Sequence, residues 1–118
     1  MMLMASATTL RVGEAVTVTV VLSNEGDLAL GLPQYWLNVG HPEAKSILNP
    51  NQPEAVVHHL AVPPGQSDTA AFVLRAVQPG QATVTASASF EVHLSYPGPA
   101  YWGGSHSKEP LLLTVEPQ

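Results

Sequence analysis

The chain has 118 residues, the usual size of one domain, and contains no cysteine, which excludes disulfides and thiolate metal sites. Nine acidic and four basic side chains give a formal net charge of −5, the wrong sign for a protein that binds the phosphate backbone of nucleic acids. Charged residues make up 11% of the chain, against about 25% in typical soluble domains, so uncharged polar residues must cover much of the surface.

Residues 1–7 open the chain with a short apolar run. Ala5-Ser6-Ala7 has the small-x-small form of a signal cleavage site, but the run is short and has no basic residue before it. We therefore expect residues 1–7 to be a ragged or cloning-derived start to a single domain that spans residues 1–118. No stretch reaches the roughly 20 apolar residues that span a bilayer, so we expect no membrane span in this chain.

Two segments have an apolar residue at alternate positions and predict β-strands. The first covers residues 14–24, where Val16, Val18, Val20 and Leu22 share one face. The second covers residues 81–93, where the apolar face consists largely of alanine and valine. Because these side chains are small, we expect a bulky partner to pack on them. The candidates are Tyr35, Trp36 and Phe72.

Weaker strand patterns fill much of the remaining chain, and turn residues separate them about every 10 to 15 residues. They cover residues 8–12, 32–39, 55–62, 67–77 and 110–115. No helical period is present, although a short helical turn could lie within residues 41–52. The pattern predicts an all-β protein, an immunoglobulin-like sandwich of about seven antiparallel strands in Greek-key order. Two long loops are expected, at residues 40–54 and 95–109.

Several turn and strand motifs resemble those of known surface modules. Leu10-Arg11-Val12-Gly13-Glu14 before the first strong strand, and Ser23-Asn24-Glu25-Gly26 after it, resemble bacterial and archaeal immunoglobulin-like repeats. Val62-Pro63-Pro64-Gly65-Gln66-Ser67 and Pro79-Gly80 continue the likeness. The chain is similar to CARDB-like domains, a bacterial cell-adhesion-related family. The resemblance implies part of a larger secreted or surface protein, and it carries over no catalytic residue.

Residues with metal-binding or catalytic chemistry form no recognisable motif. The five histidines are His41, His58, His59, His93 and His106, and none lies at a metal-type spacing. Consecutive residues on a strand point to opposite faces, so His58 and His59 are poorly placed to hold one ion. No Gly-x-Ser-x-Gly elbow occurs, and the carboxylates fall mostly at turns or on expected solvent faces. We expect no metal, no cofactor and no enzyme activity.

The candidate contact residues lie in the predicted loop 95–109, namely Tyr96, Tyr101, Trp102 and His106. Large aromatic side chains among glycines and prolines are typical of contact surfaces, because they offer much apolar area with few rotatable bonds. Three interpretations stay open: the aromatics cap the end of the sandwich, they contact a partner, or they stack on a ligand such as a sugar ring.

These observations favour a non-catalytic accessory, adhesion or spacer module, with a ligand-binding module that uses loop 95–109, for example for carbohydrate, as the alternative. The expected partners are neighbouring domains, other proteins or glycans. Unprotected sheet edges can pair, so the chain is expected to be a monomer or an edge-paired dimer. The family resemblance implies an extracellular or cell-surface location.

Overall fold

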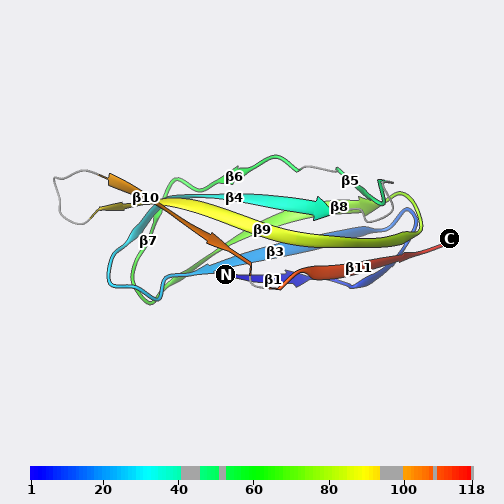
Figure 1. The fold of residues 1–118 in the computed structure, drawn as a ribbon, viewed down its shortest axis with the longest axis horizontal. Coiled ribbons are helices and arrows are strands. Elements are labelled where there is room, and N and C mark those ends of the chain that lie inside the picture. The colour runs from blue at the N-terminus through cyan, green and yellow to red at the C-terminus, as the bar shows by residue number, and fades with distance from the viewer. Residues whose placement is uncertain (41–45, 51–52, 94–99, 108, 118) are drawn as a thin grey trace.

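The strands form two sheets, and none of the residues that the structure describes is helical (Figure 1). This computed structural model describes residues 1–40, 46–50, 53–93, 100–107 and 109–117. The predicted all-β class is therefore confirmed. The described part of the chain also has no helix that could cross a bilayer.

The smaller sheet has four strands in the order β1-β3-β8-β5. Their bounds are β1 Met2–Ala5, β3 Ala15–Ser23, β5 Leu48–Asn49 and β8 Ser67–Ala76. The larger sheet has the order β2-β11-β9-β4-β6, with β10 also paired to β9 and β7 to β4. Their bounds are β2 Thr9–Arg11, β4 Leu30–Gly40, β6 Val56–Val57, β7 Ala61–Val62, β9 Gly80–His93, β10 Ala100–His106 and β11 Leu111–Glu116.

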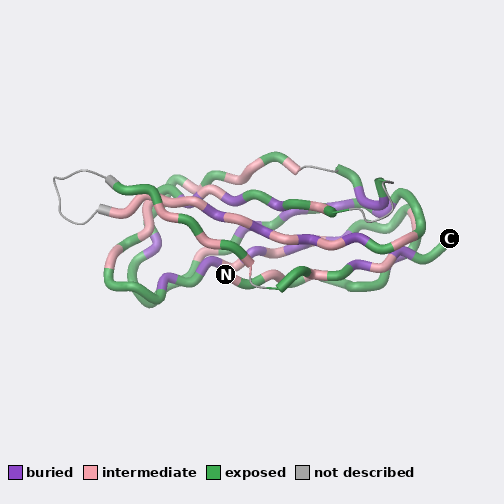
Figure 2. The backbone as a smooth tube through the Cα atoms, in the orientation of Figure 1, coloured by how far each residue is buried: buried purple, intermediate pink, exposed green. Residues whose placement is uncertain are grey.

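Buried residues recur along the central strands of both sheets (Figure 2) and form one hydrophobic core, which gives a sandwich-like arrangement. Alternate residues of β3 and β9 supply eight of its nineteen buried residues, as the period of two predicts. Tyr35 and Phe72 are buried in this core, and Tyr35 lies opposite Ala88, so these two bulky partners of the small-residue face are confirmed. Trp36 faces outward instead, because it follows Tyr35 on the same strand.

The first residues, expected to be a ragged or cloning-derived start, form strand β1 of the smaller sheet. Residues 2–5 pair antiparallel with β3, where Met2 lies opposite Val21 and Ala5 opposite Val18. Ser6 then exchanges hydrogen bonds with Thr17, after which β2 joins the other sheet and runs parallel to β11. The expectation of purely antiparallel strands is therefore wrong, because β2 and β11 are parallel. Pairing with β1 satisfies backbone groups of β3 that would otherwise lack partners.

The weaker strand predictions are right in place and less accurate in extent. Residues 55–62 form two short strands, β6 and β7, with residues 58–60 between them, and each pairs with β4. Strand β4 contains a register shift between Gly31 and Gln34, where Leu32 has a positive φ of 48°. The predicted loop 40–54 contains β5, while residues 41–45 and 51–52 lie outside the described residues, as does most of the possible helical turn. The described residues thus form eleven strands where we expected seven.

Candidate functional site

The contact residues expected on a loop lie on a strand. Residues 100–106 form β10, which pairs with β9 in one unbroken register from Ala100 opposite His93 to His106 opposite Ser87. The predicted loop 95–109 is therefore wrong over this part. Tyr101, Trp102 and His106 belong to β10, and Tyr96 lies outside the described residues.

Gly103, one of the two glycines that favoured a loop, has a packing reason within the strand. Gly103 lies opposite Phe90, and a Cβ built on Gly103 would come within 2.6 Å of Cε2 of the Phe90 ring. The ring thus occupies the space of the missing side chain. A glycine inside a strand often marks such a close approach, and an aromatic neighbour compensates for its weak strand propensity.

The register places the aromatic residues of β4 and β10 on the same outer face of the larger sheet. Trp36 lies opposite Ser87, and Ser87 lies opposite His106, so these three residues form one row across three strands. Trp102 is four residues from His106 on the same strand and therefore shares its face. His106 Nδ1 lies 3.2 Å from Ser87 Oγ, which orients the imidazole on the sheet surface.

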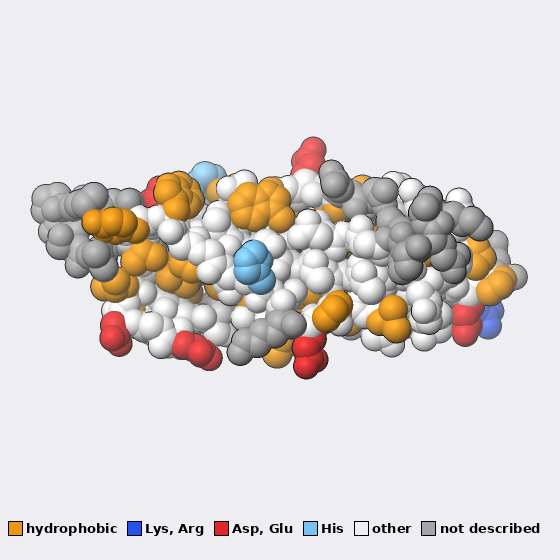
Figure 3. All heavy atoms as spheres, viewed as in Figure 1, with side chains coloured by type: hydrophobic (Ala, Val, Ile, Leu, Met, Phe, Trp, Pro, Cys, Tyr) orange, Lys and Arg blue, Asp and Glu red, His pale blue; other side chains and the backbone are white. Residues whose placement is uncertain are grey.

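This surface, which we call the tryptophan face, has aromatic margins and a floor of small polar residues. Trp102 is 67% exposed and Trp36 is 37% exposed. Between them, the next row consists of Gln34, Ser89 and Gly104. Figure 3 looks onto the larger sheet and shows hydrophobic side chains in separate groups among polar atoms, with acidic side chains toward the outline. Strand spacing and rise put Cα of Trp36 and Cα of Trp102 roughly 16 Å apart, a span suited to an extended ligand.

Tyr101 is separated from this face by the alternation of the strand. It lies opposite Val92 and points to the side of the larger sheet that faces the other sheet, yet it is 53% exposed. The structure therefore brings Trp102 and His106 together on one face and excludes Tyr101 from it. Trp36, which was one of the three candidates to pack on the small-residue face of β9, belongs to the tryptophan face instead.

A second polar cluster joins the two sheets and was missed by the sequence analysis. Asp68 begins the inner face of β8, and its Oδ2 accepts a 2.6 Å hydrogen bond from the hydroxyl of Tyr35 in β4. The same oxygen lies 2.6 Å from Nδ1 of His58, and the His58 and Tyr35 rings meet edge to face with centroids 5.5 Å apart. Burial of Tyr35, with the hydrogen bond and the charge of Asp68 adding to it, raises the pKa of the Tyr35 hydroxyl far above its usual range.

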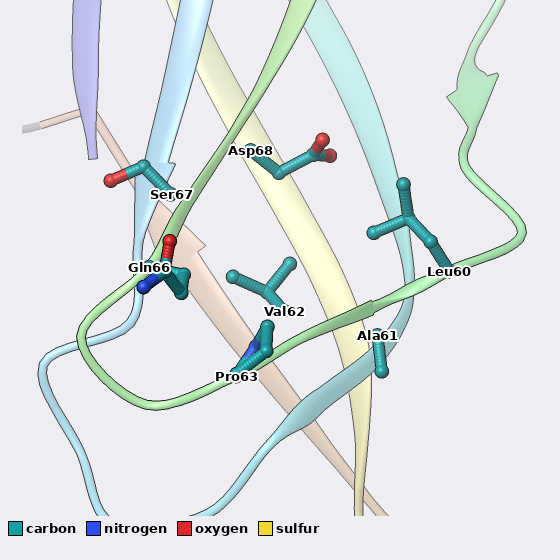
Figure 4. A pocket seen from close by; sticks show the side chains of 7 residues that line it. All are labelled: Leu60, Ala61, Val62, Pro63, Gln66, Ser67 and Asp68. Carbon is teal, nitrogen blue, oxygen red and sulfur yellow. The ribbon is translucent and has the colours of Figure 1, made fainter.

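Of the three residues in this cluster, Asp68 also lines a pocket of about 400 Å³ (Figure 4). The pocket is lined by residues of β7, of the turn that follows it and of the start of β8, including Val62, Pro63 and Asp68. In the chain, His58 lies ten residues from Asp68, and Tyr35 lies thirty-three residues from it. No local sequence motif therefore predicts the cluster. Their distances suit a hydrogen-bonded link between the sheets.

The remaining histidines do not join a common site in the described structure. His59 is exposed beside the partly buried His58, and neither lies in a strand. The side chain of His93 lies outside the described residues, as does His41. Within the described residues, no three side chains of histidine, aspartate or glutamate come together as metal ligands would.

In comparisons with protein-family models and with curated proteins, the chain matches none.

Proposed function

We propose that this chain is a non-catalytic, immunoglobulin-like contact module that binds its partner through the tryptophan face. The observation that carries the proposal is Trp102, which is 67% exposed on a strand held by a seven-residue ladder to β9. Tryptophan is the side chain most enriched at the energetic centres of binding surfaces. Exposing one on rigid backbone is costly in water and favourable at an interface.

The strand order supports the immunoglobulin-like assignment. In that fold, the first, second, fifth and fourth strands form one sheet, and the third, sixth and seventh form the other. The order β1-β3-β8-β5 follows the first set, and β4, β9 and β10 with β11 follow the second. The short strands β6 and β7, on the far side of β4, take the place of the extra strand of variable-type domains.

The wider role that we propose is that of a CARDB-like accessory, adhesion or spacer module in a larger secreted or surface protein. The turn motifs that resemble this family support it, because Asn24 and Gly65 stand at turns that organise the sheet ends. The Tyr35–Asp68–His58 cluster suits a structural role, since the shared carboxylate oxygen contacts both neighbours.

A second candidate function is binding of a carbohydrate chain to the same face. The floor of Ser87, Ser89 and Gln34 between two exposed indole rings favours it. Indole rings stack on the apolar faces of sugar rings, and small polar side chains can bond the hydroxyls at their edges.

An array that carries purified polysaccharides beside immobilised secreted and cell-surface proteins tests both candidates. We expect the labelled 118-residue chain to bind at least one class of spot and Trp102→Ala to weaken that binding at least tenfold. Val73→Ala is the matched control, because Val73 is 63% exposed on the outer face of the other sheet. Binding to polysaccharide alone selects the second candidate. Binding that is unchanged by Trp102→Ala, or equally weakened by Val73→Ala, contradicts the assignment of this face.

A further inference from the structure

Among the residues that the structure describes, β10 is the longest of the strands that pair with only one neighbouring strand. It has seven residues and pairs only with β9. The other marginal strands are shorter: β1 has four residues, β2 has three, and β5, β6 and β7 have two each. Proteins usually protect edges with short strands, prolines or lysines, and residues 100–106 contain neither proline nor lysine.

The hydrogen-bond pattern identifies the backbone groups that lie on this free edge. The Ser107 N–H donates to the Ala86 carbonyl, which continues the register of β10 with β9 by one pair. In an antiparallel ladder every second residue bonds the same neighbour. The backbone groups of Tyr101, Gly103 and Ser105 therefore point toward β9. Those of Trp102, Gly104 and His106 point away from it, toward the free edge.

The neighbouring sheet leaves this side of β10 accessible. A groove of about 670 Å³ separates the end of β10 from β1, and it is lined by Met1 and Leu3 on one side and by Ser105 and Ser107 on the other. The first strand of the smaller sheet therefore does not cover this edge.

We propose that two copies of this chain pair through β10, antiparallel and two-fold symmetric, with Gly104 on the symmetry axis. Two identical antiparallel strands can bond only through residues whose backbone groups face outward in both copies. In the register centred on Gly104, this residue meets the second copy's Gly104, and Trp102 meets the second copy's His106. Trp102, Gly104 and His106 are then bonded in both copies, which gives about six backbone hydrogen bonds.

The side chains suit this register. Gly104 has no side chain, so no pair of identical side chains has to fit next to each other at the symmetry axis. Trp102 and the second copy's His106 lie directly opposite on the same face, and aromatic cross-strand pairs of this kind stabilise sheets. Residues 100–106 also carry no carboxylate, so no like negative charges meet along the two paired strands.

The dimer does not depend on the proposed function, although pairing through β10 would enlarge the tryptophan face. Pairing through β10 would join the two larger sheets into one continuous sheet, so the tryptophan faces of both copies would lie side by side. Array binding by the wild-type chain and the mass of that chain are separate measurements, so either proposal can fail without the other.

Sedimentation velocity over a concentration series tests the dimer. We expect the mass to rise from 12.4 kDa toward twice that value with concentration. Gly104→Lys places two like charges at the axis and should raise the dissociation constant at least tenfold. Ser89→Lys is the matched control, because Ser89 lies opposite Gly104 on the same face but inside the sheet. A wild-type chain that stays monomeric at all concentrations, or two lysine variants with equal effects, overturns the proposal.

Cross-linking tests the register in a chain that has no native cysteine. Cα atoms of a hydrogen-bonded antiparallel pair are about 5.5 Å apart, within disulfide range. We expect Gly104→Cys to form a covalent dimer under mild oxidation. Ser89→Cys should not form one, because three strand spacings would separate the two sulfurs. A cooperative thermal unfolding transition for each variant would show that the variant is folded. A covalent dimer from both variants, or from neither, contradicts the register.

Discussion

Gly103 lies directly beneath the ring of Phe90, close enough that a Cβ on Gly103 would meet Cε2 of that ring at 2.6 Å. The contact joins β10 to β9 at the centre of their ladder, where the two residues are paired. It explains how a segment with two consecutive glycines can be an ordered strand.

Replacing Gly103 by alanine should destabilise the protein, because the ring must move from its place over the strand. We expect a loss of about 1 to 2 kcal/mol in the free energy of unfolding, as for other overpacked sites, measured by urea denaturation. Gly104→Ala is the control, since its Cβ would meet only the Ala88 carbonyl oxygen, at 3.4 Å. Phe90→Ala should reduce the effect of Gly103→Ala. Additive effects of the two substitutions would show that the contact is unimportant.

Removing the hydroxyl of Tyr35 should also destabilise the fold. Tyr35→Phe deletes the 2.6 Å hydrogen bond to Asp68. Of the two side chains in this cluster that contact the Asp68 carboxylate, only His58 then remains. Hydrogen bonds to charged groups contribute about 1.5 to 3 kcal/mol, so we expect a loss of that size in urea denaturation. Tyr101→Phe, at an exposed position, should change stability by less than about 0.5 kcal/mol. Equal stability of Tyr35→Phe and wild type would rule out the link between the sheets.

The same hydroxyl should make stability fall at alkaline pH. The pKa of Tyr35 is raised in the folded state, first by burial and then by Asp68, whereas in the unfolded chain it is about 10. The unfolded state therefore loses this proton first, and the stabilisation present below pH 10 is lost as the pH rises above it. The stability difference between wild type and Tyr35→Phe should shrink by up to about 1.4 kcal/mol per pH unit from pH 10 upward. A difference independent of pH over this range would contradict the raised pKa.

Asn24 should be sensitive to substitution, because its side chain connects two turns. Its amide nitrogen donates to the carbonyls of Leu28, at 2.7 Å, and Val62, at 2.9 Å, and its oxygen accepts from the Gly26 N–H. The residue is 4% exposed, so Asn24→Ala leaves these partners without replacement. We expect a loss of about 2 to 3 kcal/mol in thermal or urea unfolding. Ser23→Ala, at the exposed neighbouring position, serves as the control and should be nearly neutral.

Local alternation was enough to predict the central strands. The valines of β3 and the alanines of β9 recur every second residue, and the observed core uses those faces. The all-β class and the turn at Asn24 follow from the same short-range patterns. Alternation alone could not show which of Tyr35 and Trp36 is buried, because either of two adjacent aromatic residues could occupy the inner face of the strand. The strand had to be paired before one of them could be placed inside.

The margins of the sheets were the least predictable part. Strands β1 and β10 have weak patterns of their own and exist because β3 and β9 offer unpaired backbone groups beside them. The Tyr35–Asp68–His58 cluster is likewise made of residues distant in the chain. A carboxylate on the inner face of β8 was the available signal, since a buried acid needs a partner.

The segment from Tyr101 to His106 shows which features the sequence determines and which features the tertiary structure determines. Its composition, aromatic and free of acidic residues, follows from the sequence alone and indicates a contact surface. Its form is a property of the tertiary structure, because Phe90 supplies the packing that Gly103 lacks and β9 supplies the hydrogen bonds. Strand pairing then placed Trp102 and His106 on the same face as Trp36. The register between strands that are distant in the chain determines which residues share a face of the sheet.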